Sequence, residues 1–231
     1  MNLSFIWQIG NSSGNELKGV KEVPLWDIIQ ESNAGIGWLI NLFLVLMFAY
    51  VIFVFVERYF ALRKASKEDS DFLSQVKQLL TKGDIENAKK KCVSSDSPSA
   101  RMLEKGISRI GKPMESIAAS IENTGKLEVL RLEQRLSFLA TAAGAAPMLG
   151  FLGTVIGMMV VFIDLQNTAT LELKVIAPGI MTAMVTTVAG LIVGIIAFMG
   201  YNYLVGRIGK VVYQMENAAL EFMDLLNQPG K

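Results

Sequence analysis

The sequence has no histidine and a single cysteine, Cys92, and these two scarcities exclude several kinds of chemistry. A lone cysteine cannot form an internal disulfide. Zinc, copper and haem sites take their ligands mainly from histidine and cysteine, so we expect no metal site and no cofactor. Ser-His-Asp and Cys-His catalysis both need an imidazole and are excluded. Since no other nucleophile–base pair is evident, we do not expect an enzyme.

Charge is also scarce in three long parts of the chain. The net charge is only +1, which gives no reason to expect a nucleic-acid partner. The stretches Ile36–Val56, Ser137–Ile163 and Val175–Val205 carry no charged residue. Each reaches the roughly 20 residues that a bilayer-spanning helix needs, and a buried helix of a soluble protein rarely runs so long without a charge. The sequence therefore predicts an all-α membrane protein with three transmembrane helices.

The distribution of lysine and arginine predicts the orientation of these spans. Two basic residues, Lys18 and Lys21, precede the first span, and sixteen lie between the first and second spans. Only one basic residue, Lys174, lies between the second and third spans. By the positive-inside rule, the N-terminus lies outside and the long loop and the tail lie in the cytoplasm. The first residues lack the basic region of a signal peptide, so we expect the first span to direct its own insertion.

The predicted organisation follows from these spans. In chain order it consists of an external N-terminus with a short amphipathic interfacial helix (1–35), the first transmembrane helix (36–56), a cytoplasmic helical domain (57–135), the second transmembrane helix (136–163), a short external loop (164–174), the third transmembrane helix (175–205) and a cytoplasmic helical tail (206–231).

Apolar periodicity predicts helices in the cytoplasmic parts. One stripe runs from Phe72 to Leu80 and ends at Gly83, and Ser97, Pro98 and Gly111 mark further breaks. After Pro113 the pattern predicts a helix that runs directly into the second span. In the tail, apolar residues alternate steps of three and four, which predicts that the third span continues as one long helix packed on the loop helices. These tail residues are Ile208, Val211, Met215, Ala218, Phe222 and Leu225.

The second and third spans are unusually rich in small residues and each contains a proline. Small residues let membrane helices approach closely, so these two spans should pack against other helices, either in copies of this chain or in a partner. Each proline frees a backbone carbonyl and favours a kink. The residues that we assign to packing and kinks are Pro147, Gly150, Gly153, Gly157, Pro178, Gly179, Ala183 and Gly190.

Four threonines lie among these small residues: Thr154, Thr182, Thr186 and Thr187. In one interpretation each hydroxyl bonds to a carbonyl of its own helix and has no further role. In the other, the hydroxyls line a polar path through a helical bundle. Intramembrane carboxylates usually mark proton relays, and neither span has one. If protons pass here, their carrier must therefore belong to another chain.

The stretches "APMLGFLGTVIGMM" and "VIAPGIMTAMVTTVAGLIVGIIAFMGYNYL" strongly resemble the MotA/TolQ/ExbB family of proton-channel subunits. The three spans and the long first loop resemble its ExbB/TolQ branch. The resemblance implies a homopentamer in the bacterial inner membrane, with a periplasmic N-terminus and with spans two and three around a central pore. It also implies an ExbD/TolR-like partner with one span and an intramembrane aspartate, and a TonB-like protein that receives work from the proton motive force.

The resemblance also assigns roles to individual positions. Thr154 matches the threonine of the family's Gly-Thr-Val element, Thr187 matches the threonine of the third span, and both are expected to face the pore near the partner's aspartate. Asn202 matches a polar position at the inner pore end. Many ExbB and TolQ members carry a glutamate where this chain has Thr182, so that position cannot titrate here. Sodium in place of protons stays open, since hydroxyls and freed carbonyls can coordinate it.

The task that such a motor would power stays open at this point. TolQ-like envelope maintenance and motility are alternatives to TonB-dependent transport, because the partner's periplasmic domain determines the output. An alternative from another class is a non-conducting membrane scaffold that assembles through its glycine faces.

Overall fold

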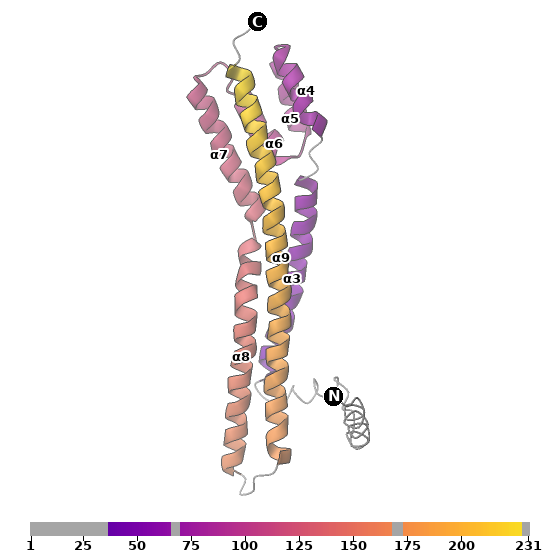
Figure 1. Ribbon diagram of the computed structural model, residues 1–231, viewed down its shortest axis with the longest axis vertical. Helices are drawn as coiled ribbons and strands as arrows, with labels where there is room; N and C mark the ends of the chain where they lie inside the picture. Colours follow the sequence, from indigo (N-terminus) through magenta and orange to yellow (C-terminus); the bar gives the residue numbers. More distant parts are fainter. Residues whose placement is uncertain (1–36, 66–69, 168–172, 228–231) are drawn as a thin grey trace, which may run out of the picture. The chain divides into compact units, whose positions relative to one another are not determined.

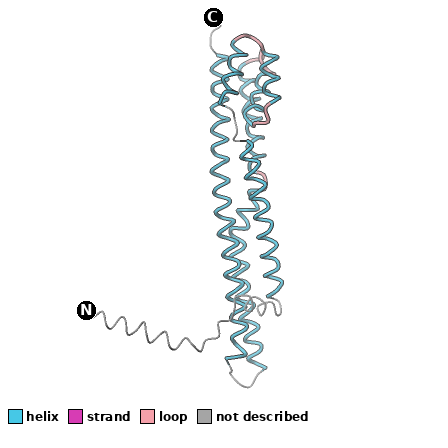
Figure 2. Tube along the Cα trace, turned by 90° about the vertical axis from the view of Figure 1, so that its right-hand side faces the viewer, coloured by secondary structure: helices cyan, strands magenta, loops and turns pink. Residues whose placement is uncertain are grey.

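The computed structural model describes residues 37–65, 70–167 and 173–227, and within these ranges it contains helices and no strand (Figures 1 and 2). The helices are α3 (Gly37–Ala65), α4 (Ser70–Thr81), α5 (Ile85–Ser94), α6 (Pro98–Ile107), α7 (Met114–Glu133), α8 (Leu136–Asn167) and α9 (Leu173–Asn227). The predicted all-α fold is thus confirmed. The predicted interfacial helix before the first span lies outside the described residues.

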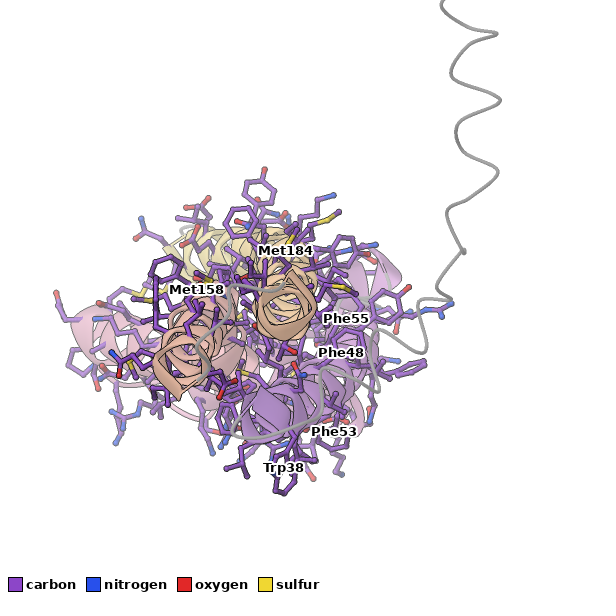
Figure 3. All side chains as sticks on the ribbon, turned by 90° about the horizontal axis from the view of Figure 1, so that it is seen from below. Trp38, Phe48, Phe53, Phe55, Met158 and Met184 are labelled. Atoms are coloured by element: carbon purple, nitrogen blue, oxygen red, sulfur yellow. The ribbon has the colours of Figure 1, made fainter. Side chains whose placement is uncertain are left out.

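Three of these helices are long and apolar enough to cross a membrane, as the sequence predicted. The candidate spans are Trp38–Ala65, Leu136–Gln166 and Gly179–Asn227. Large apolar side chains on α3 point outward, including Trp38 and Phe53 in Figure 3, and Phe53 is 57% exposed. Such a surface suits lipid, because a water-soluble protein rarely exposes so much contiguous apolar area.

The chain divides into two compact units. The first consists of Met1–Phe43 with Leu149–Ala189, and the second of Leu44–Met148 with Gly190–Lys231. The first unit therefore contains the later part of α8 and the earlier part of α9. The second contains α4 to α7 together with the remaining parts of α3, α8 and α9.

The larger core of the second unit forms where α4, α5, α6 and α7 pack around the C-terminal part of α9 (Figure 1). The predicted tail stripe lies in this region: Ile208, Val211, Met215, Ala218 and Phe222 are all buried, and Leu225 is half-buried. In α4, Phe72 and Val76 are buried in the same core. The prediction that the third span continues as one helix is confirmed, because α9 runs for 55 residues.

The short connections in this unit use the expected turn and cap residues. Gly83 adopts φ +75° directly after α4, a conformation that glycine reaches without steric cost. Asp84 then caps α5 by accepting a bond from the Asn87 amide. Ser97 caps α6 in the same way, and Pro98 occupies its first turn. Ser97, Pro98 and Gly111 therefore break the chain where the sequence predicted.

One prediction about this unit is wrong. The helix after Pro113 does not run directly into the second span: α7 ends at Glu133 and α8 begins at Leu136. Arg135 lies between them with φ +66° and is the one residue other than glycine with a positive φ in the described part of the chain. The apolar pattern continues on both sides of the break, so the hydrophobic spacing gave no sign of it.

A second, smaller core joins α3, α8 and α9 in this unit. It comprises Val54, Leu62, Leu136, Leu139, Leu204 and Ile208. In the same unit, α9 also approaches α8 at Pro147. A Cβ atom added to Gly194 would lie 2.7 Å from Cγ of Pro147 and 3.2 Å from the Ala143 carbonyl oxygen. Since Pro147 has no amide hydrogen for that carbonyl, glycine lets α9 pack on the helical turn that the proline leaves open.

Candidate functional site

In the first unit, α8 and α9 pack through the small residues that the sequence singled out. A Cβ atom on Gly153 would lie 2.7 Å from Cβ of Thr186, and one on Gly157 would lie 2.9 Å from Cβ of Ala183. A Cβ atom on Gly179 would collide with the Val161 side chain. Any side chain at these glycines would therefore push the two helices apart. This contact within one chain explains why small residues lie on the face of α8 that meets α9 and on the face of α9 that meets α8.

Thr186 lies at the centre of this contact and is fully buried, with 0% exposure. Its hydroxyl donates to the Ala183 carbonyl three residues earlier, at 2.8 Å. This bond satisfies the donor within α9 itself. The position of Thr186 between the two helices favours a packing role.

Thr187 is different because its hydroxyl crosses to the other helix. It is half-buried and donates to the Gly150 carbonyl of α8 at 3.1 Å. In an α-helix the carbonyl of residue 150 also accepts the amide of residue 154. The Thr187 hydroxyl therefore lies beside the backbone of Thr154, and the contact brings together the two threonines that the sequence singled out from different spans.

The side chain of Thr154 is half-buried, and its hydroxyl donates to the Phe151 carbonyl at 2.6 Å. A threonine hydroxyl has one donor and two acceptor lone pairs. Because the donors of Thr154 and Thr187 are both engaged by carbonyls, their oxygens are available as acceptors. Thr182 is half-buried on the same part of α9.

The remaining predicted residues fall in different places. Gly150 is buried in the first unit, whereas Pro147 and Gly190 belong to the second. Asn202, also in the second unit, is exposed and donates to the Phe198 carbonyl at 2.8 Å. Pro178 lies within the first turns of α9. The structure thus brings Thr186 and Thr187 together with five of the small residues in the α8–α9 contact of the first unit, namely Gly150, Gly153, Gly157, Gly179 and Ala183. Asn202 belongs to the other unit.

No acidic, basic or histidine side chain accompanies these hydroxyls along the uncharged stretches 137–163 and 175–205. Within the described residues, no group of three or more acidic, histidine or cysteine side chains could hold a metal ion. The site is thus a close-packed contact of α8 and α9 that offers the hydroxyl oxygens of Thr154 and Thr187 as acceptors and has no proton carrier of its own.

Sequence reasoning missed the charged contacts of the second unit. Glu128 is buried between Arg101 and Arg131, and Glu57 pairs with Arg135 across 78 positions of sequence. Glu128 is one charged residue in the sequence of α7, and nothing in its neighbours indicates that it is buried. No local sequence pattern connects Glu57 to Arg135. These contacts became visible only in the fold.

Comparison with known proteins agrees with the resemblance. Residues 94–217, more than half of the chain, match the family model described as the MotA/TolQ/ExbB proton channel family. The Tol-Pal system protein TolQ of Haemophilus influenzae is 32% identical over 158 residues, which are 68% of this chain and 64% of that protein. A putative biopolymer transport protein ExbB homolog of Methanothermobacter thermautotrophicus is 28% identical, over 57% of its own length.

A longer match extends over nearly the whole chain. The biopolymer transport protein ExbB of Salmonella typhimurium is 27% identical over 225 residues, which are 91% of this chain and 88% of that protein. The matched family is one of proton channels rather than of enzymes. The three membrane helices and the family match identify the chain as a membrane protein, and it belongs to the MotA/TolQ/ExbB proton channel family.

Proposed function

We propose that this chain is an ExbB-like subunit of a proton-driven motor in the bacterial inner membrane. Together with an ExbD-like partner it would use the proton motive force to energise TonB-dependent transport across the outer membrane. The long ExbB match, over 91% of the chain, supports the choice of an ExbB-like subunit. The basic residues between spans one and two favour a periplasmic N-terminus and a cytoplasmic tail.

The observation that carries the proposal is the Thr187–Gly150 contact beside Thr154. Both threonine donors are engaged by backbone carbonyls, so their oxygens can accept a bond from a protonated carboxyl group. In this proposal that group is the intramembrane aspartate of a single-span partner. Its proton is held at Thr154 and Thr187 and is then released toward the cytoplasm.

The outer faces of α8 and α9 are compatible with assembly around such a partner. Met184 on α9 points outward in Figure 3 and is 62% exposed, and Phe162 on α8 is 60% exposed. These side chains require lipid or further helices. We propose that copies of this chain, five by the family resemblance, cover part of this surface and enclose the partner's helix.

A TolQ-like role in envelope maintenance is the second candidate. It is favoured by the higher identity to TolQ, 32%, over a shorter part of the chain. The two roles differ in the periplasmic domain of the partner and not in the residues of α8 and α9. The non-conducting scaffold stays the alternative from another class.

The first experiment is to extract the native complex in mild detergent, identify the co-purifying proteins by mass spectrometry and measure the intact mass. The proposal expects a small partner with one span and an aspartate in it, and the periplasmic domain of that partner discriminates the TonB-type task from the Tol-type task. If the chain purifies only with itself, the motor lacks its proton carrier and the scaffold is favoured.

The second experiment measures proton passage with a pH-sensitive dye in liposomes that contain the purified complex. Thr154→Val removes the hydroxyl with little change of shape. We expect roughly a tenfold loss of proton passage, as for one hydrogen bond of about 1.4 kcal/mol, at an unchanged intact mass. Thr141→Val is the matched control, because Thr141 is an exposed residue of α8 whose hydroxyl bonds to the Ser137 carbonyl of the same helix. Equal passage in both variants would contradict the proposal.

A further inference from the structure

Two consecutive residues of α3 contact both sides of the break between α7 and α8. A carboxylate oxygen of Glu57 accepts a bond from Nη1 of Arg135, the left-handed residue of the break. Nη1 of Arg58 donates to the Arg131 carbonyl near the end of α7, at 3.3 Å. The contacts join residues 78 and 73 positions apart, and all four residues belong to the second unit.

The Arg58 contact follows from the chemistry of a helix end. The last four carbonyls of a helix have no intrahelical partner, and that of Arg131 is among them, because α7 ends at Glu133. A guanidinium group there supplies a donor and a favourable charge for the helix dipole. Arg58 is only 9% exposed, so its side chain is buried at the end of α7.

The contact between Arg135 and Glu57 involves a residue in a backbone conformation that L-residues seldom adopt. At φ +66° the Cβ atom is crowded by the backbone, and such a residue keeps this conformation only where its surroundings hold it. The ion pair to Glu57 is the long-range side-chain contact that the structure gives Arg135. Glu57 therefore contributes directly to the conformation of the break.

The end of α7 is itself anchored. The Arg131 side chain donates to Glu128 at 2.6 Å, and Arg101 of α6 donates to the same carboxylate at 2.7 Å. The Glu128 side chain is only 3% exposed. The Arg58 contact thus links α3 to the end of α7, which the bonds of Glu128 to Arg101 and Arg131 hold against α6.

We propose that Glu57 and Arg58 form a clamp on the α7–α8 break, which sets the direction in which α8 leaves it, and that Glu57 and Arg135 are positioning residues for proton passage. The second part rests on the proposed function. From Leu136 to Asn167 α8 is one helix, and it carries Thr154. A change of direction at the start of α8 alters the placement of the membrane helix that bears the proposed proton-handling hydroxyl.

The test uses the complete complex and the variants Glu57→Ala, Arg135→Ala and the double variant. Alanine at position 135 has the same left-handed cost as arginine, so Arg135→Ala removes the side-chain contact alone. Lys126→Ala is the matched control, because Lys126 forms an exposed ion pair with Glu122 within α7. The readouts are amide hydrogen exchange at residues 138–142, whose amides bond to the break and to the first turn of α8, together with intact mass and proton passage in liposomes.

We expect each single variant to raise amide exchange at residues 138–142 roughly two- to fivefold, the range for loss of a partly exposed ion pair. The double variant should not exceed Glu57→Ala, because Glu57→Ala already removes the contact to Arg135 together with the weaker 3.7 Å pair between Glu57 and Arg58. Proton passage should fall in the same variants at unchanged intact mass, and Lys126→Ala should match the wild type. Additive effects on exchange, or exchange equal to that of Lys126→Ala, would overturn the clamp.

Arg135→Gly separates side chain from backbone, since glycine adopts the left-handed conformation freely. The clamp predicts faster exchange than wild type in this variant as well, and wild-type exchange with full proton passage would overturn it. If the wild-type complex passes no protons, the proposed function fails, while amide exchange still tests the clamp. If the variants change exchange and leave proton passage intact, the clamp is structural and the positioning role is wrong.

Discussion

The Thr187 hydroxyl donates to the Gly150 carbonyl oxygen at 3.1 Å, from α9 to α8. That oxygen also accepts the Thr154 amide in the helical pattern of α8, so a single backbone atom connects the two threonines. In an environment without water such a contact both fixes the register of two helices and leaves the hydroxyl oxygen as an acceptor.

Thr187→Val should therefore change both packing and proton passage. The variant loses the interhelical bond at a cost of about 0.5–1.5 kcal/mol and loses the acceptor oxygen. We expect proton passage in liposomes to fall as strongly as in Thr154→Val, with an unchanged intact mass of the complex. Thr187→Ser keeps the hydroxyl and should restore most of the passage. Full passage in Thr187→Val would contradict a role for this hydroxyl in proton transfer.

Gly153→Ala should weaken the α8–α9 contact. The added methyl group would lie 2.7 Å from Cβ of Thr186, which is fully buried and cannot move aside. Overpacking of this kind costs about 1–3 kcal/mol, so we expect a lower thermal unfolding temperature in detergent. Gly144→Ala, on the same helix, is the control: a Cβ atom there meets nothing within 4 Å. Its effect should be neutral or stabilising, because alanine is the better helix former.

The elements that could be predicted from the sequence are those with local and periodic signals. The uncharged stretches gave the three membrane helices, and the alternating steps of three and four gave the buried face of the tail from Ile208 to Phe222. Small residues with four-residue spacing predicted close packing of both spans, because close approach of backbones needs glycine or alanine at each turn. The sequence assigned that packing to copies of this chain or to a partner, and the structure adds a contact between α8 and α9 of one chain.

The break at Arg135 could not be predicted in this way. Arginine has no preference for positive φ, and apolar residues continue on both sides of it. Its cause includes Glu57, which is 78 residues away, and long-range ion pairs leave no periodic pattern in a sequence. The same reason explains why Glu128 was not recognised as buried. Among the threonines, sequence alone also could not separate Thr186, which packs, from Thr187, which bridges two helices.

Cys92 should be inert as a nucleophile in the folded protein. It is 1% exposed in the core of the second unit, and burial, with the nearby charge of Glu104, raises the pKa of its thiol from 9.0 to about 12. We expect no labelling by a maleimide reagent at neutral pH until the protein is unfolded. Val93→Cys in a Cys92→Ala background is the control, because Val93 is 68% exposed, and it should react at once. Rapid labelling of native Cys92 would show that this core opens.

The raised pKa of Cys92 also has a consequence for stability. A thiol with a higher pKa in the folded state than in the unfolded state stabilises the fold below pH 9, and this contribution is lost as the pH rises from about 9 to about 12. Between these values the unfolded chain has released a proton that the folded chain retains. Cys92→Ala should remove this part of the alkaline destabilisation, which urea titrations at a series of pH values would detect.

Neutralisation of Glu128 should destabilise the packing of α6 and α7. Its side chain is 3% exposed and accepts bonds from Arg101 and Arg131, and the bond to Glu128 raises the pKa of Arg101. Glu128→Gln keeps the shape, removes the charge and leaves two guanidinium groups beside a neutral amide. We expect a loss of about 1–3 kcal/mol, the range for hydrogen bonds to charged groups, measured by urea unfolding of the purified complex.

Glu133→Gln is the control for this prediction. Glu133 is exposed on the same helix, and its substitution by glutamine changes the charge by the same amount. Surface substitutions of this kind usually stay within about 0.5 kcal/mol. Exposed ion pairs contribute little to stability, whereas a buried carboxylate between two cations must recover the cost of its own desolvation from their hydrogen bonds. Equal stability of Glu128→Gln and Glu133→Gln would show that the Arg101–Glu128–Arg131 contact offsets its desolvation and contributes nothing further to the fold.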